Sequence, residues 1–325
     1  MTALFPGHLK GLEEKLTQGI ADVEAMLRSE ITSDFELADI TGRHLVEAGG
    51  KRFRPLIVLL AAQFGDPKSK GVIPAAVVVE LTHLATLYHD DVMDEAPVRR
   101  GAQSANARWG NTVAILSGDF LFARSSKLLA DLGPEAVRVQ AETFERLVIG
   151  QMSESVGPKI GQDPVEHHLQ VLADKTGSLI AAAGRYGAMM SGVNPELTDC
   201  IAEFCEAIGI AFQLSDDLLD IASDVSGKTP GTDLREGVKT LPALLALADT
   251  NTSERLQDLL SRPLPLDSEH AEALQLLRAH PAMSQARLVL NEWTARARNQ
   301  LQYLPEGQAR DALLELCESV ANRDI

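Results

Sequence analysis

The sequence is poor in aromatic residues and has no excess of positive charge. Phe, Trp and Tyr together make up only 4% of the 325 residues, whereas apolar residues make up 45%. A chain of this length can bury a large core, which aliphatic side chains and alanine would fill. The alternation of apolar and polar residues that is typical of strands is nearly absent, so we predict an all-α fold.

The net charge and the few cysteines exclude several classes of protein. The formal net charge is −16 at pH 7, which argues against binding to nucleic acid. An anionic substrate must therefore be captured by local basic residues and metal. Cys200, Cys205 and Cys317 are an odd number of cysteines without the spacing of zinc ligands, and we interpret them as free thiols in a reducing compartment.

Long apolar runs and internal divisions are also missing. The N-terminal segment lacks the apolar region of a signal peptide, and we find no run of about 20 apolar residues that would span a membrane. We therefore expect a cytoplasmic protein that is at most peripheral to a membrane. Because no linker, repeat or change of composition divides the chain, we predict one domain over residues 1–325.

Two aspartate clusters, DDVMD at 90–94 and DDLLD at 216–220, lie within apolar stretches of helical periodicity. The first and fifth residues of each cluster share a helix face. A single such cluster is more often a solvated acidic face, but two copies near basic residues indicate bound cations. Oxygen ligands suit Mg²⁺, and two clusters across a cavity would hold several ions and a polyanion. The candidate ligands are Asp90, Asp91, Asp94, Asp216, Asp217 and Asp220.

Basic residues accompany both clusters. In the segment 49–54, glycines allow the backbone to approach a ligand, and lysine and arginine suit phosphate. His83 is about two helical turns before Asp90, so it faces the same way. The pattern predicts one anion site formed through metal and one without metal, the latter through Lys51, Arg54 and Arg100. The other cationic candidates are Arg99, Lys175 with its neighbour Thr176, Lys228 and Lys239.

The periodicity also predicts the order of the helices. A proline opens the helix of the first cluster, at Pro74, and another ends it, at Pro97. A helix capped by Asn194 runs through the second cluster, and a polar, glycine-rich loop follows over 224–240. The remaining helices are expected at about 7–28, 34–48, 55–65, 111–132, 134–156, 165–192 with a break near Gly177, and in several pieces over 240–323.

Several of these motifs, taken in order, resemble the trans-isoprenyl diphosphate synthases, the polyprenyl synthetase family. They are GGKRFRP, the segment from His83 through DDVMDEAPVRRG, KTGSL, FQLSDDLLD and GKTPGTDLREGVKTLPAL, between about residues 43 and 245. In the GKTPG segment the proline lies one position later than is usual in the family. We therefore expect a shifted loop geometry there without loss of Lys228.

The resemblance implies a large single-domain helical bundle around a deep central cavity. It further implies a homodimer, dependence on Mg²⁺ with three ions per active site, and condensation of isopentenyl diphosphate with an allylic diphosphate. By the same resemblance, the two aspartate clusters bind the metal. Arg99, Lys175, Lys228 and Gln213 contact the allylic diphosphate, and Lys51, Arg54, His83 and Arg100 bind isopentenyl diphosphate. Lys239 is a further candidate contact, and Thr176, Gln213 and the backbone near Lys175 would stabilise an allylic cation.

The length of the product depends on how deep a tunnel remains open. Short-chain members of the family place aromatic residues five and four positions before the first cluster, whereas Ala85 and Thr86 are small here. We therefore expect a polyprenyl product of C30–C50, as for a quinone side chain, with a tunnel floor formed by Phe122, or by Phe144 and Leu147. Ala85 could instead be small only for helix packing.

Four other functions are alternatives to this interpretation. A short-chain farnesyl or geranylgeranyl diphosphate synthase would end its tunnel near the first cluster. A class I terpene cyclase needs no second diphosphate site, and a head-to-head synthase is also a rival. A non-catalytic subunit of a heteromeric synthase would be expected to lose aspartates or basic residues, and this chain retains them.

Overall fold

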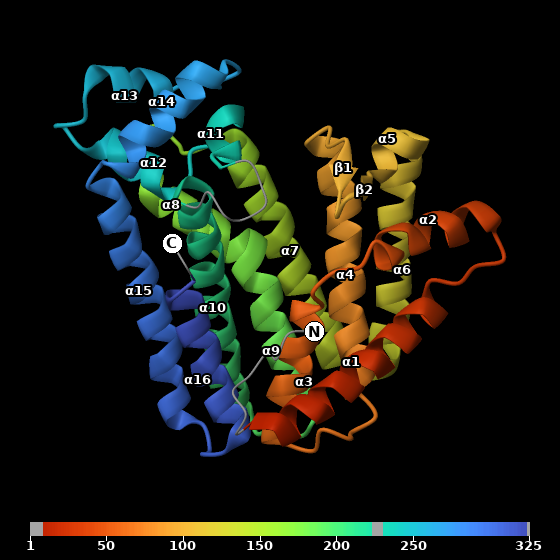
Figure 1. Cartoon of the computed structure of the whole chain (residues 1–325). Coiled ribbons are helices and arrows are strands. Elements are labelled where there is room, and N and C mark those ends of the chain that lie inside the picture. The colour runs from red at the N-terminus through yellow and green to blue at the C-terminus, as the bar shows by residue number, and fades with distance from the viewer. Residues whose placement is uncertain (1–8, 223–229, 324–325) are drawn as a thin grey trace. The chain divides into compact units, whose positions relative to one another are not determined.

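The computed structural model describes residues 9–222 and 230–323. Within these ranges the regular structure is almost entirely helical (Figure 1). The only strands described there are β1 (Val98–Arg99) and β2 (Ala102–Gln103), which form one short antiparallel pair. The predicted all-α fold is confirmed.

The residues group into two compact units, each assembled from segments that are distant in the sequence. The first aspartate cluster belongs to unit 1 and the second to unit 2, and each unit is described by itself. The single domain over 1–325 stays a prediction. Unit 1 comprises Met1–Phe144, Leu179–Ala202 and Tyr303–Ala312, and unit 2 comprises Glu145–Ser178, Glu203–Gln302 and Leu313–Ile325.

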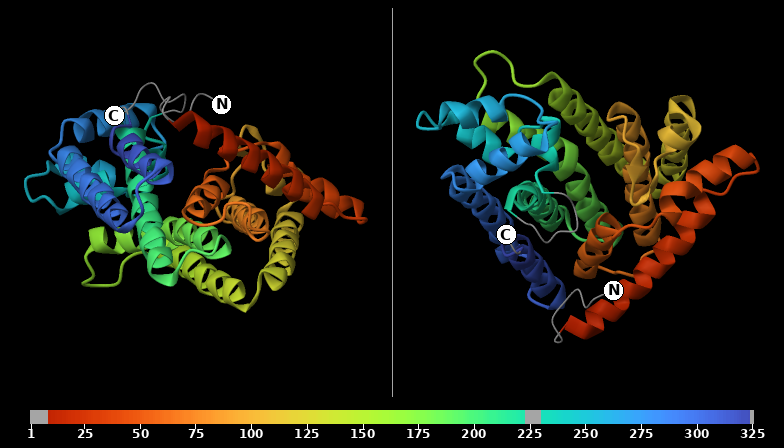
Figure 2. Two further views of the ribbon diagram at one scale, coloured as in Figure 1. Left: turned by 90° about the horizontal axis from the view of Figure 1, so that it is seen from below. Right: turned by 45° about the horizontal axis from the view of Figure 1, so that its top comes forward.

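Unit 1 is built around α4 (Val72–Met93), in which Val78 and Leu81 are fully buried. Helix α6 (Asn111–Leu132) packs so closely along α4 that a Cβ at Gly118 would lie only 3.1 Å from the Ala85 carbonyl oxygen. Helix α1 (Lys10–Glu30) lies against α3 (Phe53–Ala61) and α4 (Figure 2). Unit 1 also contains α2 (Glu36–Glu47), η2 (Ala62–Phe64), α5 (Ala105–Trp109), most of α9 (Ser178–Met190), and the first parts of α7 (Pro134–Val156) and α10 (Pro195–Ala222).

Helix α4 is unusually apolar for its length. Among the described helices it alone is long and apolar enough, by length and composition, to cross a membrane, and we did not expect such a segment. However, 67% of its most apolar window is buried inside the protein. The composition of α4 is therefore accounted for by its place in the core of unit 1.

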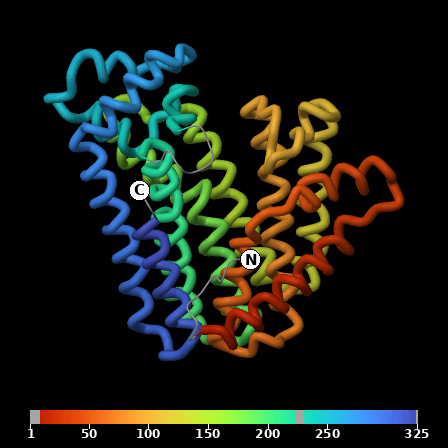
Figure 3. Tube along the Cα trace, in the orientation of Figure 1, coloured from red at the N-terminus to blue at the C-terminus, as the bar shows by residue number. Residues whose placement is uncertain are grey.

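Unit 2 has a core of its own, in which Ile221 at the end of α10 meets Leu234, Leu259 and Leu277. Helix α12 (Leu241–Ala248), in the cyan part of the trace in Figure 3, packs against α15 (Ala282–Gln300) in the blue part. The other elements of unit 2 are the second part of α7, α8 (Pro164–Leu172), η3 (Ala173–Gly177), α11 (Thr232–Glu236), α13 (Glu254–Leu260), α14 (Asp267–Arg278), most of η4 (Leu301–Tyr303) and most of α16 (Gln308–Ala321).

Most of the predicted helices are confirmed, and two predicted details are wrong. Helices α6 and α7 have the predicted limits, and the Asn194 side chain accepts a hydrogen bond from the Leu197 N–H at 2.9 Å, as a capping residue does. However, α4 begins at Val72, two residues before Pro74. The expected loop over 224–240 also contains helix α11, which is stabilised by burial of Leu234.

Candidate active site

The first aspartate cluster lies where α4 ends. Asp90 is partly exposed and Asp94 is exposed, and their spacing places them on one face of the helix, as predicted. Asp91 differs, because its side chain is fully buried. Its Oδ1 lies 2.6 Å from Arg99 Nε, and its buried Oδ2 has no hydrogen-bond partner among the described residues. Burial raises the pKa of Asp91, and the contact with Arg99 opposes that shift.

A tight hairpin returns Arg99 to the helix that precedes it. Arg100 and Gly101 have φ values of 54° and 78°, and positive φ at both central residues suits a two-residue hairpin turn. Strands β1 and β2 pair on either side of this turn, with Arg99 opposite Ala102. The turn therefore directs two successive arginines to different targets, Arg99 to the first cluster and Arg100 to the segment 49–50.

Arg100 binds the glycine segment that the sequence singled out. Its guanidinium donates hydrogen bonds to the carbonyl oxygens of Gly49 and, at 3.1 Å, of Leu45. A Cβ at Gly50 would lie 2.9 Å from Arg100 Nη1, and Gly50 has a φ of 149°. Glycine at this position therefore serves both the backbone conformation and the close approach of Arg100.

Arg52, which the sequence interpretation passed over, is the buried arginine of this segment. It contacts Glu24 Oε1 at 2.5 Å and Glu80 Oε1 at 2.8 Å, and it donates to the Val46 carbonyl at 3.0 Å. Its backbone has a φ of 49°, in the left-handed region that residues other than glycine rarely adopt, and these contacts hold it there. Arg52 thus anchors the segment through its own side chain. The neighbouring Lys51 and Arg54 are available for a ligand.

Arg54 and Arg100 form a cationic environment beside His83. Burial lowers the pKa of Arg54 to about 10, against the attraction of Glu80 and together with the repulsion of Arg100. Burial, and then the charges of Arg54 and Arg100, lower the pKa of His83 well below its usual value. The Arg54 Nε is buried and, within the described part of the chain, lacks a hydrogen-bond partner. This cluster, with the exposed Lys51 nearby in sequence, is suited to an anion.

The second aspartate cluster lies near the end of α10, where each carboxylate has a different partner. Asp217 is buried, and its two oxygens lie 3.2 Å from His168 Nε2 and 3.3 Å from Gln213 Nε2. Asp220 accepts hydrogen bonds at 3.3 Å from two backbone N–H groups at the start of α11. Asp216 forms an ion pair with Arg323, whose guanidinium also lies 4.4 Å from the centre of the Phe212 ring.

Lys175 and Thr176 lie in η3, a π-helical turn, which agrees with the predicted break near Gly177. Both are partly exposed, and the Lys175 ammonium forms an ion pair with Glu154. Lys239 is exposed in the segment before α12. Lys228 and the first part of the loop expected over 224–240 lie outside the described residues.

The donors in both clusters are carboxylate oxygens, which suit a hard divalent cation such as Mg²⁺. The unpartnered Asp91 Oδ2 also fits a cation or a further donor. No group of three His, Cys, Asp or Glu side chains in the described ranges is arranged to hold a metal by itself. The residues therefore fit a metal that takes part of its coordination from a diphosphate or from water.

One pocket of unit 1 lies beside the first cluster, between α4, α6 and α7. It encloses about 480 Å³ and includes His89, Ser125 and Gln140 in its lining. Phe122 and Phe144 also line it, with ring centres 4.6 Å apart. Ala85 is fully buried one turn before His89 and is not part of the lining.

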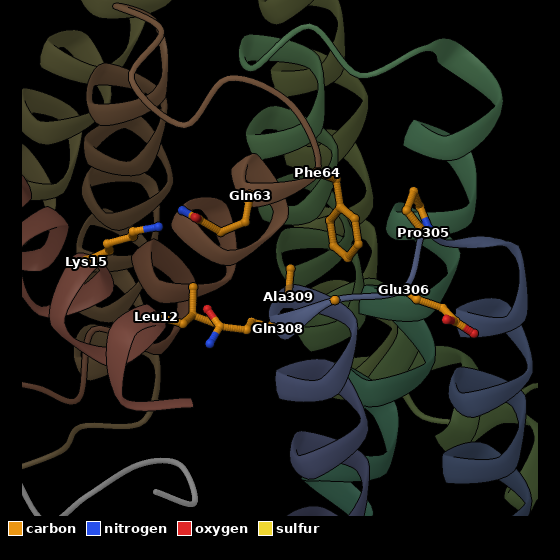
Figure 4. A pocket seen from close by; sticks show the side chains of 9 residues that line it. Leu12, Lys15, Gln63, Phe64, Pro305, Glu306, Gln308 and Ala309 are labelled. Atoms are coloured by element: carbon orange, nitrogen blue, oxygen red, sulfur yellow. The ribbon is translucent and has the colours of Figure 1, made fainter. Parts of the chain in front are cut away.

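A smaller pocket of unit 1, of about 280 Å³, has a different character (Figure 4). Lys15 and Gln63 lie on one side of it and Pro305 and Glu306 on the other. Lys15 is the only cation among its lining residues. This pocket is therefore poorly suited to a diphosphate, and we assign it no role.

Comparison with known proteins decides the family. The polyprenyl synthetase family profile matches residues 36–277. The chain belongs to the polyprenyl synthetase family. It is 50% identical over 309 residues to nonaprenyl diphosphate synthase from Mycobacterium tuberculosis, covering 94% of this chain and 92% of that one. It is also 44% identical over 302 residues to dimethylallyltranstransferase from the same organism, covering 92% of each chain.

A solved structure extends this likeness to the fold. Geranylgeranyl pyrophosphate synthase from Corynebacterium glutamicum, complexed with calcium and isoprenyl diphosphate, is 45% identical. It superposes with a TM-score of 0.87 and covers 96% of this chain and 97% of that one. The predicted family, the isoprenoid synthase fold and the class of enzyme, a prenyltransferase, are confirmed.

Proposed function

We propose that this polyprenyl synthetase condenses isopentenyl diphosphate with an allylic diphosphate in the trans configuration. The observation that carries the proposal is the cluster of Arg54, His83 and Arg100 beside the first aspartate cluster. Condensation requires two diphosphate sites, and this basic cluster supplies one that needs no metal. A terpene cyclase has no use for such a second site.

The two aspartate clusters would hold the divalent metal, which we propose is Mg²⁺ with three ions per active site. When bound, Mg²⁺ supplies Lewis-acid stabilisation of the charge on the departing diphosphate. The ligands from the chain would be Asp90, Asp91, Asp94, Asp216, Asp217 and Asp220. Calcium in the Corynebacterium glutamicum structure supports the use of a divalent ion by this family.

The side chains near the diphosphates would orient the reaction. Arg99, Lys175, Lys228 and Gln213 would bind the allylic diphosphate, and Lys51, Arg54, His83 and Arg100 would hold isopentenyl diphosphate in position to attack. Thr176 and Gln213 would direct their dipoles at the allylic cation. Lys239 would add positive charge near the same substrates. Because no side chain is an evident base, the departed diphosphate is the proposed proton acceptor.

We propose a product of C30–C50, because Ala85 and Thr86 are small. Ala85 shares a face of α4 with His89, which lines the pocket that contains Phe122 and Phe144. These two aromatic rings are the candidates for the floor of the tunnel. The nonaprenyl diphosphate synthase at 50% identity supports a long product, whereas the geranylgeranyl synthase structure marks the shorter alternative.

We further propose that the protein is a homodimer in the cytoplasm. It would be peripheral to a membrane when it releases its product. Helix α6 exposes 43% of Ile115 and 60% of Leu116, which a second copy could cover. Light scattering of the purified chain tests this part. A single protomer would contradict the homodimer but not the reaction.

The reaction itself is tested with purified protein, Mg²⁺, farnesyl diphosphate and labelled isopentenyl diphosphate. We expect incorporation of label that depends on both the metal and the allylic primer. If no label is incorporated with any of several primers, the condensing activity is refuted for the chain by itself.

A further inference from the structure

The π-helical turn η3 presents Lys175 and Thr176 in unit 2. Such a turn interrupts the regular helical ladder, is rare, and occurs frequently at functional sites. Here the turn spans Ala173–Gly177 and follows α8 directly. Two residues of α7, Gly150 and Arg146, contact this turn.

Gly150 on α7 allows the turn to approach the neighbouring helix. A Cβ at Gly150 would lie 2.7 Å from the Lys175 backbone nitrogen and 3.0 Å from the Asp174 Cβ. The first distance is shorter than real Cβ contacts, and its target is backbone, which cannot turn aside. Any larger residue would therefore displace either α7 or the turn.

Arg146, one turn earlier on α7, binds the same part of the turn. Its Nε lies 2.8 Å from Asp174 Oδ1, and its Nη2 donates to the Ala173 carbonyl at 3.3 Å and to Glu206 on α10. Gln170 donates to the other oxygen of Asp174 at 2.7 Å. Both oxygens of this nearly buried carboxylate are therefore occupied by side chains that arrive from two helices.

The charge on Arg146 suits its contacts with the carboxylates of Asp174 and Glu206. Burial would lower its pKa, but the contacts with Glu206 and Asp174 outweigh burial and raise it. The guanidinium is thus a permanent cation whose planar fork reaches two carboxylates and a backbone carbonyl. A lysine would keep the charge but could not reproduce the fork.

We propose that Arg146 and Gly150 are positioning residues that fix η3 so that Lys175 and Thr176 are presented to the allylic substrate. The inference rests on the proposed function for the role of Lys175 and Thr176. Neither Arg146 nor Gly150 is expected to touch the substrate. They act through Asp174 and through the backbone of the turn.

The variants Arg146→Met and Arg146→Lys test the proposal, with Arg185→Met as the matched control. Arg185 has the same side-chain exposure, 37%, and a single ion pair, 2.8 Å to Asp199. Amide hydrogen exchange of the substrate-free protein reports on the turn directly. We expect about tenfold faster exchange over 173–177 in Arg146→Met, less in Arg146→Lys, and wild-type exchange in the control.

Kinetics separate positioning from general loss of structure. Arg146→Met should raise the KM for the allylic diphosphate about tenfold and leave the KM for isopentenyl diphosphate unchanged, because that substrate is assigned to residues of unit 1. Gly150→Ala should give the same pattern, and it serves as the second variant if Arg146→Met does not fold. Unchanged exchange over 173–177 in the folded variants, or an equal rise in both KM values with a lowered Tm, would overturn the proposal. If the wild-type chain does not elongate, the proposed function fails, whereas the exchange experiment still tests the positioning.

Discussion

Arg99 Nε lies 2.6 Å from Asp91 Oδ1, and this contact separates the middle carboxylate of the first cluster from its two neighbours. The Asp91 side chain is fully buried, whereas that of Arg99 is 30% exposed. Removing one partner of a buried ion pair leaves the other uncompensated, which costs more than the pair itself contributes. Asp91 and Arg99 are therefore coupled before any metal or substrate binds.

This coupling predicts that Arg99→Leu destabilises the metal-free protein by about 1–3 kcal/mol. The additional change Asp91→Asn should recover part of that loss, because it removes the unpaired charge. Urea unfolding of the single and double variants measures the effect, with Asp94→Asn as the control at an exposed position. Full stability of Arg99→Leu would mean that the contact contributes nothing to the fold.

His83 predicts a dependence of stability on pH. In the unfolded chain it titrates near 6.5, whereas in the folded protein its pKa is well below that value. The unfolded state therefore takes up the proton first, and the folded protein loses stability as the pH falls below about 6.5, by at most ~1.4 kcal/mol per pH unit. Above that pH the group makes no difference.

Urea unfolding between pH 8 and pH 5.5 checks this sign. We expect the slope below about pH 6.5 to be smaller in His83→Gln than in the wild type. His167→Gln, at a partly exposed position, should keep the wild-type slope. Equal slopes in all three proteins would show that His83 titrates normally when the chain is folded.

We predict that Arg54 contributes to the binding of isopentenyl diphosphate but not to the stability of the substrate-free protein. Burial and the repulsion of Arg100 oppose its charge more than Glu80 favours it, and its Nε is unpaired in the described structure, so Arg54→Met should leave the substrate-free protein at least as stable as the wild type. The lost charged hydrogen bond should cost about 1.5–3 kcal/mol of binding, or roughly a 10- to 150-fold rise in the KM for isopentenyl diphosphate. An equal rise in the KM for the allylic substrate would contradict the assignment of two separate sites.

We predict that the size of the side chain at position 85 limits the length of the product. Ala85→Phe should shorten the products relative to the wild type, because a ring would close the tunnel that small residues leave open. Since Ala85 is fully buried, a melting curve must accompany the assay, and Thr86→Phe, at a partly exposed position, provides a second variant. If both folded variants give the wild-type set of products, neither residue lines the tunnel.

The sequence predicted well what depends on local spacing. Helical periodicity and the i, i+4 rule located both aspartate clusters, and the motif order identified the family. It did not predict the partners of Asp217 and Asp216, His168 and Arg323, because they are 49 and 107 residues away and belong to no local pattern. Helix α11 was missed because its five residues are too short for periodicity and depend on Asp220 and buried Leu234.

Arg52 shows a different limit. The run of basic residues at 51–54 indicated an anion site, but spacing alone could not tell which of them faces a ligand. The carboxylates of half-buried Glu24 and buried Glu80, each 28 residues away along the chain, bind Arg52. Only the three-dimensional contacts show that Arg52, the middle one of the three basic residues, is structural.

The measurement that tests the central claim most directly is the length of the product made by the purified wild-type chain. With Mg²⁺, farnesyl diphosphate and labelled isopentenyl diphosphate, the dephosphorylated products are compared with chain-length standards. We predict a ladder that ends between about C30 and C50, as expected when small residues leave the tunnel open beyond the first cluster. An end at about C15 or C20 would contradict the long tunnel, and an absence of incorporation would contradict the condensing activity.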